Sequence, residues 1–153
     1  MTEPRYVLPI AVRFSDVNAM GHVNNAVYLT YFEEARVGYY AAVTGEPFEA
    51  PPRAGASLIA ARASIEYRSP AYLGERLLVG CRTTWAGRSS LGMEYGVTAA
   101  AESSHGGGRL VAEGQTVIVT FDYELARPVP IPAAIRASIE AWEGGPLPAR
   151  PPR

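Results

Sequence analysis

Residues 13–44 read RFSDVNAMGHVNNAVYLTYFEEARVGYYAAVT, a short polar loop that runs directly into a long apolar segment. Asn24 or Asn25 is the expected N-cap, because an asparagine side chain accepts hydrogen bonds from the free amides of a first turn. Gly45 is the expected stop, so the sequence predicts one helix ending at about Thr44. Apolar residues surround this helix on almost every side, which is typical of a buried helix.

The structure that covers the helix is predicted to be a sheet, because five other segments carry strand patterns. They span residues 6–14, 58–68, 77–85, 91–99 and 110–123, and a short closing helix is expected at 135–142. The order of elements predicts an α+β fold, in which an antiparallel sheet of about five strands wraps around one long central helix.

The bulk composition indicates one compact domain. With 153 residues, 48% of them hydrophobic, we expect a single domain over residues 1–143 and a flexible Pro/Arg-rich tail over 144–153. A net charge of -1 argues against a nucleic-acid partner. No apolar stretch approaches the roughly 18 residues of a membrane span, so no membrane partner is expected. The single cysteine, Cys81, fits a reducing compartment, and we expect a cytoplasmic protein.

The polar loop is the part of the chain best equipped for chemistry. A helix N-terminus offers free backbone N–H groups and partial positive charge. Acid–base and amide side chains beside it can bind a carbonyl and stabilise the oxyanion that forms on attack. With two histidines and no cluster of ligand residues, the sequence does not predict a metal site.

Four motifs occur in the order found in a known family. They are Phe14-x-Asp16-x-Asn18-x-x-Gly21-His22-Val23-Asn24-Asn25-Ala26-x-Tyr28 continuing into Tyr31-Phe32-Glu33-Glu34-Ala35-Arg36, then Ile65-Glu66-Tyr67 with Pro70-Ala71 and Gly74-Glu75, then Gly87-Arg88-Ser89-Ser90, then Arg127-Pro128. Over about residues 6–140 the chain resembles the hotdog-fold acyl-CoA thioesterases, in particular the 4-hydroxybenzoyl-CoA thioesterase-like group. The resemblance implies hydrolysis of a fatty or aromatic acyl-CoA to free acid and CoA, with no cofactor besides the CoA of the substrate.

One position departs from the family pattern, which usually reads Asp-x-Asp before the glycine. Here the second acid, generally taken as the catalytic carboxylate, is Asn18. An amide is neither a carboxylate nucleophile nor a general base, although it can orient a water molecule. We therefore expect His22 or Asp16 to be the base.

The other catalytic candidates are the Asn25 N–H, expected to bind the oxyanion, and Glu33, a reserve base on an apolar helix. Two of the acids also have structural interpretations. Asp16 can pair with Arg13, and Glu33 has the spacing to pair with Arg36.

Binding of CoA phosphates requires cations, and Arg68, Arg88 and Arg127 lie at predicted strand ends or turns, with Ser89 in the same turn as Arg88. Ordinary solvated arginines are an equally good interpretation of these three side chains. The aromatic residues of the helix can line an acyl tunnel or simply form the core; they are Tyr28, Tyr31, Phe32 and Tyr39.

Two alternative functions and the oligomeric state remain open from the sequence. The protein can bind acyl-CoA or acyl-carrier thioesters without turnover, which Asn18 would explain. It can be a hydratase or dehydratase of the same fold. An exposed edge strand predicts a homodimer, which can pair again into a homotetramer.

Overall fold

The computed structural model describes residues 3–47 and 56–152. Its elements in chain order are β1 (Tyr6–Ala11), the 3-10 helix η1 (Phe14–Asp16), α1 (Val27–Thr44), β2 (Ala56–Tyr67), β3 (Arg76–Ala86), β4 (Ser90–Ala99), β5 (Leu110–Asp122), β6 (Arg127–Pro128) and α2 (Ala133–Glu143). None of the helices in these ranges is long and apolar enough to cross a membrane.

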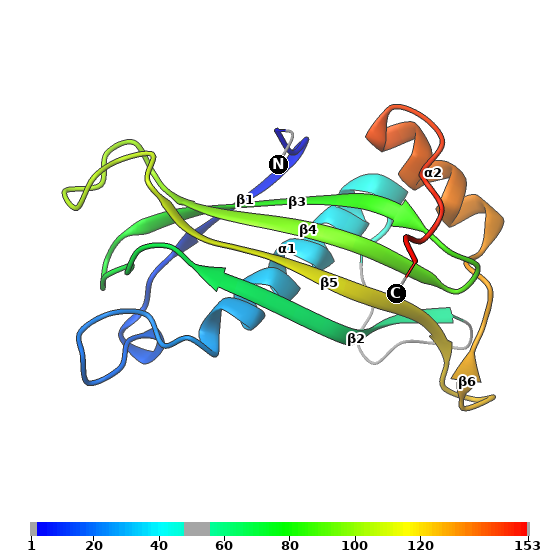
Figure 1. Ribbon diagram of the computed structural model, residues 1–153, viewed down its shortest axis with the longest axis horizontal. Coiled ribbons are helices and arrows are strands. Elements are labelled where there is room, and N and C mark those ends of the chain that lie inside the picture. The colour runs from blue at the N-terminus through cyan, green and yellow to red at the C-terminus, as the bar shows by residue number, and fades with distance from the viewer. Residues whose placement is uncertain (1–2, 48–55, 153) are drawn as a thin grey trace.

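The strands form one antiparallel sheet in the order β1-β3-β4-β5-β2, with β6 paired to the end of β5. Figure 1 shows α1 lying across one face of this sheet. The predicted α+β fold with an antiparallel sheet and a helix is confirmed. The described residues hold six strands and two α-helices, so the predicted count of about five strands around one long helix is not confirmed. The additional strand, β6, is two residues long, too short to show a period-two pattern.

The polar residues before α1 hold its first turn. The Ala26 N–H lies 3.0 Å from both the Asn24 and the Asn25 side-chain oxygens. Ala26 is itself the N-cap residue, so the asparagines act from one and two positions before the cap. At the other end Gly45 has a φ of 74° and donates its N–H to the Ala41 carbonyl at 2.9 Å, which confirms the predicted stop.

The core lies between α1 and the sheet. Phe32 is fully buried and its ring stacks on that of Tyr95 at 4.4 Å. Gly114 on β5 lies directly beneath, where an added Cβ would come within 2.5 Å of the Phe32 ring. A side chain at position 114 would displace the Phe32 ring, whose burial stabilises the fold by about 3 kcal/mol. The close approach therefore explains the glycine.

The C-terminal tail lies against the sheet, and Figure 1 shows it in front of the strands. The Ala86 N–H donates to the Pro148 carbonyl at 2.9 Å, and the Arg150 guanidinium lies 5.4 Å from the centre of the Trp85 ring. These contacts give the tail a docked position, whereas its flexibility stays a prediction from composition.

Candidate functional site

A pocket of about 520 Å³ lies where the start of α1 meets the end of β2, near the arrowhead of β2 in Figure 1. Its lining consists of Asn18, His22, Val23, Asn25, Tyr28, Tyr67, Arg68, Ser69 and Pro70. The structure therefore brings together Asn18, His22 and Asn25 from the motif loop with Arg68, which follows the last residue of β2.

Asn18 and His22 are fixed by a tight turn. The Asn18 N–H donates to the His22 carbonyl at 2.9 Å, and the Asn18 side-chain oxygen accepts the Met20 N–H at 2.9 Å. Gly21 completes the turn with a φ of +84°, a conformation that favours glycine. With its oxygen engaged, Asn18 presents its NH₂ group as the remaining donor.

The His22 ring is half-buried, and its one polar contact with the described residues is weak, 3.4 Å from Nδ1 to the Val23 carbonyl oxygen. A proton on Nδ1 would face that carbonyl, and Nε2 would then be the ring's acceptor. In this tautomer Nε2 carries no proton and can accept one, as a general base must.

The start of α1 supplies a backbone donor to the same pocket. The Asn25 N–H has no acceptor among the described residues, and the Asn25 carbonyl accepts the Tyr67 hydroxyl at 3.0 Å. This N–H lies just before the positive end of the helix dipole, where it can stabilise an oxyanion.

Asp16 does not line the pocket. It is 2% exposed, and its carboxylate accepts the Arg13 N–H at 2.9 Å, the Arg13 guanidinium at 3.0 Å and the Tyr31 hydroxyl at 2.9 Å. Burial alone would raise the pKa of Asp16, but the hydrogen bonds from Arg13 and Tyr31 hold it below its ordinary value. A carboxylate held in this way is a weak base, and its contacts match the structural interpretation.

The remaining predicted site residues lie elsewhere. Glu33 is exposed on α1 and borders a small cavity with Arg36, without an ion pair between them in the described residues. Arg88 and Ser89 lie in the turn between β3 and β4, and Arg127 lies on β6. Figure 1 shows β6 at the end of the sheet opposite the start of α1, so these three residues are far from Arg68 within one chain.

Tyr67 and Ser69 line the pocket, and sequence reasoning did not identify them as site residues. The Tyr67 ring packs edge-on against Tyr28 at 5.5 Å. Burial raises the pKa of Tyr28 to about 12, so its hydroxyl stays protonated. Residues 58–68 alternate between apolar and polar positions, with Tyr67 among the apolar ones, but this periodicity does not indicate which end of the helix that face meets. Tyr31, Phe32 and Tyr39 are buried in the core.

An ion pair between Arg109, which is half-buried, and Glu75, which is buried, lies beside the Pro70 part of the pocket lining. The Arg109 guanidinium donates to the Glu75 carboxylate at 2.7 Å and to the carbonyl of Pro70, a lining residue, at 2.8 Å. Glu75 also accepts the Ser103 hydroxyl and the Tyr72 N–H. Hydrogen bonds from Arg109 are the main reason that the pKa of Glu75 falls to about 2.

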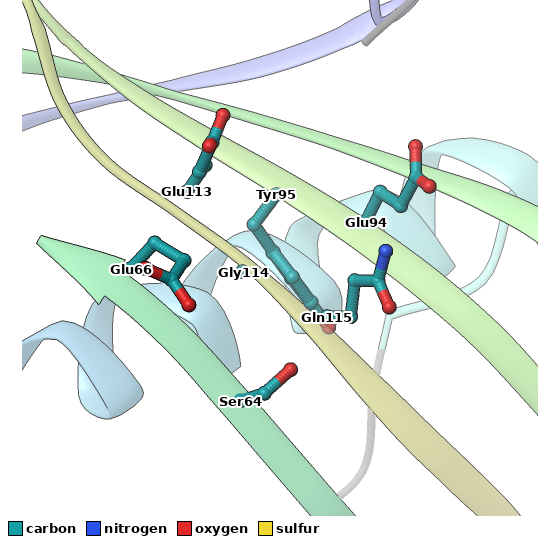
Figure 2. A pocket seen from close by; sticks show the side chains of 7 residues that line it. All are labelled: Ser64, Glu66, Glu94, Tyr95, Glu113, Gly114 and Gln115. Atoms are coloured by element: carbon teal, nitrogen blue, oxygen red, sulfur yellow. The ribbon is translucent and has the colours of Figure 1, made fainter. Parts of the chain in front are cut away.

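A second hollow, of about 630 Å³, lies on β2, β4 and β5, and Figure 2 shows its lining. Glu66, Glu94 and Glu113 border it. Glu113 is paired with Arg68 at 2.6 Å, and the other two carboxylates repel the phosphates of a CoA-type ligand, so this hollow is a poor candidate for such a ligand. No group of three or more potential metal ligands occurs in residues 3–47 and 56–152.

The fold and this first pocket define a class of protein: an α+β domain with a polar pocket, suited to acyl-transfer chemistry, at the start of its long helix. The sequence profile of the thioesterase-like superfamily matches residues 12–139, so the chain belongs to that superfamily. The predicted resemblance is thereby confirmed. No curated protein sequence matches the chain.

Solved structures agree with this family. A thioesterase from Thermus thermophilus, solved with coenzyme A and zinc, is 37% identical, with a TM-score of 0.77 over 96% of this chain and 100% of that one. A 1,4-dihydroxy-2-naphthoyl-CoA thioesterase from Synechocystis shares the fold at 22% identity, with a TM-score of 0.75 over 88% of this chain and 94% of that one. A gentisyl-coenzyme A thioesterase shares it at 19% identity, with a TM-score of 0.76 over 87% and 98%.

Proposed function

We propose that the protein hydrolyses the thioester of an acyl-CoA to the free acid and coenzyme A. The observation that carries the proposal is the pocket at the start of α1, which is lined by His22, Asn18 and Asn25, whose N–H has no acceptor within the described part of the chain. Membership of the thioesterase-like superfamily supports the same reaction.

In the proposed mechanism the thioester carbonyl oxygen lies at the Asn25 N–H, which stabilises the oxyanion together with the helix dipole. His22 Nε2 takes a proton from a water molecule while the water oxygen bonds to the carbonyl carbon, and Asn18 orients that water. Collapse of the tetrahedral intermediate breaks the C–S bond, and His22 returns the proton to the departing thiolate. Coenzyme A arrives with the substrate, so this reaction needs no separate cofactor.

The test is thiol release from a panel of fatty and aromatic acyl-CoA esters. Replacement His22→Ala should lower kcat by roughly 10²–10⁴-fold, because it removes a general base. His105→Ala is the matched control: His105 is exposed, stacks on Tyr72 and does not line the pocket. Equal losses in the two variants would refute the assignment of His22.

The amide at position 18 favours one second candidate, a protein that binds acyl thioesters, on CoA or a carrier protein, without turnover. Asn18→Asp separates the two functions. If Asn18 serves catalysis by orienting water, the wild type turns over and the substitution changes the rate modestly. If only Asn18→Asp releases thiol, the natural protein is a binder.

A homodimer explains why the predicted CoA-binding residues lie at two ends of the sheet. β2 is an edge strand of the described sheet, and its residues 60–64 are all exposed. Antiparallel pairing of β2 with the same strand of a second copy, about a two-fold axis, puts the start of one β2 beside the end of the other. The start of β2 lies near Ser89, because Thr120 pairs with Leu58 and donates its N–H to the Ser89 carbonyl at 2.9 Å.

In this dimer Arg88, Ser89 and Arg127 of one copy approach the Arg68 end of the other. Mixing His22→Ala protein with Arg88→Ala/Arg127→Ala protein tests the arrangement. Mixed dimers would contain one site with all native residues, so activity should exceed the mean of the two parents. Activity equal to that mean would place each site within one chain. We also propose that two such dimers can pair into a tetramer and that the protein is cytoplasmic.

A further inference from the structure

Arg36 is a buried cation with one weak polar contact among the described residues. It lies on the inner side of α1 and is 9% exposed. Its one hydrogen bond to a described residue runs from Nη1 to the Tyr95 hydroxyl at 3.4 Å, which is long for such a bond. A guanidinium carries five N–H donors and is normally paired when it is buried.

The guanidinium borders a cavity of about 20 Å³, whose other described lining residues are Glu33, Val37, Tyr40 and Leu58. This volume holds one water-sized group. Glu33 is the one described carboxylate in the lining, and it forms no ion pair with Arg36. The cavity therefore offers a positive group that a described carboxylate does not neutralise.

The inner face of β2 leads from the candidate active site to this guanidinium. Ala63 and Ala60 stand on that face, since they pair with the buried residues Thr116 and Ile118, and both alanines are exposed. The Tyr95 hydroxyl that meets Arg36 is also 3.0 Å from the Thr116 hydroxyl, so the guanidinium lies near the level of Ala63. From Tyr67, in the pocket wall, to Ala63 is four residues of strand, about 13 Å.

We propose that Arg36 binds a carboxylate at the far end of the acyl group, so that the substrates are CoA thioesters of dicarboxylic acids. This inference rests on the proposed thioesterase function. A guanidinium binds a carboxylate oxygen through charge-assisted hydrogen bonds, burial strengthens that attraction, and the cavity of about 20 Å³ admits one such oxygen. Ile65 lies on the same face between Tyr67 and Ala63, so the acyl chain would pass over that side chain before it reaches the two alanines. Glu33 opposes the bound anion, although its exposure weakens the repulsion.

The test compares kcat/KM for length-matched pairs of substrates: succinyl- with butyryl-CoA, adipyl- with hexanoyl-CoA and suberyl- with octanoyl-CoA. The wild type should prefer the dicarboxylic member of at least one pair. Arg36→Met should lower that preference by roughly 10–100-fold, because a charged hydrogen-bonded contact is lost. Glu33→Gln should raise the preference by a few-fold, since it removes a like charge. An unchanged preference in both variants overturns the inference.

A second measurement separates this inference from the proposed function. The ligand is a thioether analogue of suberyl-CoA, in which the chain with its terminal carboxylate is attached to the CoA sulfur without the thioester carbonyl. Its binding to the wild type and to Arg36→Lys is measured by calorimetry. Tight binding that weakens in Arg36→Lys, without hydrolysis of any ester, supports the carboxylate site and refutes the thioesterase. Hydrolysis of every ester, with analogue binding equal in wild type and Arg36→Lys, refutes the site alone. Arg36→Lys keeps the charge, so it also serves if Arg36→Met does not fold.

Discussion

Two neighbouring clusters of polar residues lie at or beside the candidate pocket, and they differ in how fully their polar groups are bonded. In the first cluster, Asn18, His22 and Asn25 leave an NH₂ group, a ring nitrogen and a backbone N–H without strong partners among the described residues. In the second cluster, Glu75 accepts four hydrogen bonds, from Arg109, Ser103 and Tyr72. Groups that are fully bonded hold the fold, whereas groups left open are available to a ligand.

Asp16 belongs with the second kind although in the sequence it lies beside the first cluster. Its three partners account for both carboxylate oxygens, as the partners of Glu75 do. The comparison therefore assigns the two buried acids to stability and the open groups to chemistry. Substitutions should separate these two effects.

The largest expected effect on stability comes from Arg109→Met. It leaves the Glu75 carboxylate buried without its cation, and the free energy of unfolding should fall by about 3–5 kcal/mol. Urea unfolding measures the loss. Arg76→Met is the matched control, because its ion pair with Glu102 is more than half exposed and is worth about 1 kcal/mol or less. Similar losses in both variants would show that the Glu75 pair has no special role.

Acid should weaken the fold through the same carboxylate. Glu75 has a pKa of about 2 in the folded protein against an ordinary value of 4.5, so the unfolded chain binds more protons between these values. The stabilisation is complete above about pH 4.5 and is lost as the pH falls through 2, by up to about 3 kcal/mol. Asp16 adds to the loss in the same direction. Unfolding free energies measured across this range in wild type and Glu75→Gln should converge at the acid end; a constant difference would contradict the argument.

The sequence predicted the parts of this arrangement that local patterns determine. The helix end at Gly45, the alternating strands and the motif loop all follow from spacing and residue type, and the loop led to Asn18, His22 and Asn25. The Glu75–Arg109 pair was missed because its partners are 34 residues apart and nothing local marks them. Arg88 and Arg127 were grouped with Arg68 because strand ends look alike in a sequence, which does not say which end of the sheet each occupies.

The sharpest test of the comparison is Tyr31→Phe, which removes one partner from Asp16 and changes nothing in the pocket lining. Loss of a hydrogen bond to a charged, buried acceptor should lower the unfolding free energy by about 2 kcal/mol. Turnover of the folded variant should stay within a few-fold of the wild type, because Arg13 still holds the carboxylate in place. Tyr123→Phe, at a side chain that is 57% exposed, controls for loss of a hydroxyl. The contrary outcome is a loss of activity in Tyr31→Phe as complete as in His22→Ala, at unchanged stability. Asp16 would then act in the chemistry, and the number of hydrogen bonds that an acid accepts would no longer distinguish structural acids from catalytic ones.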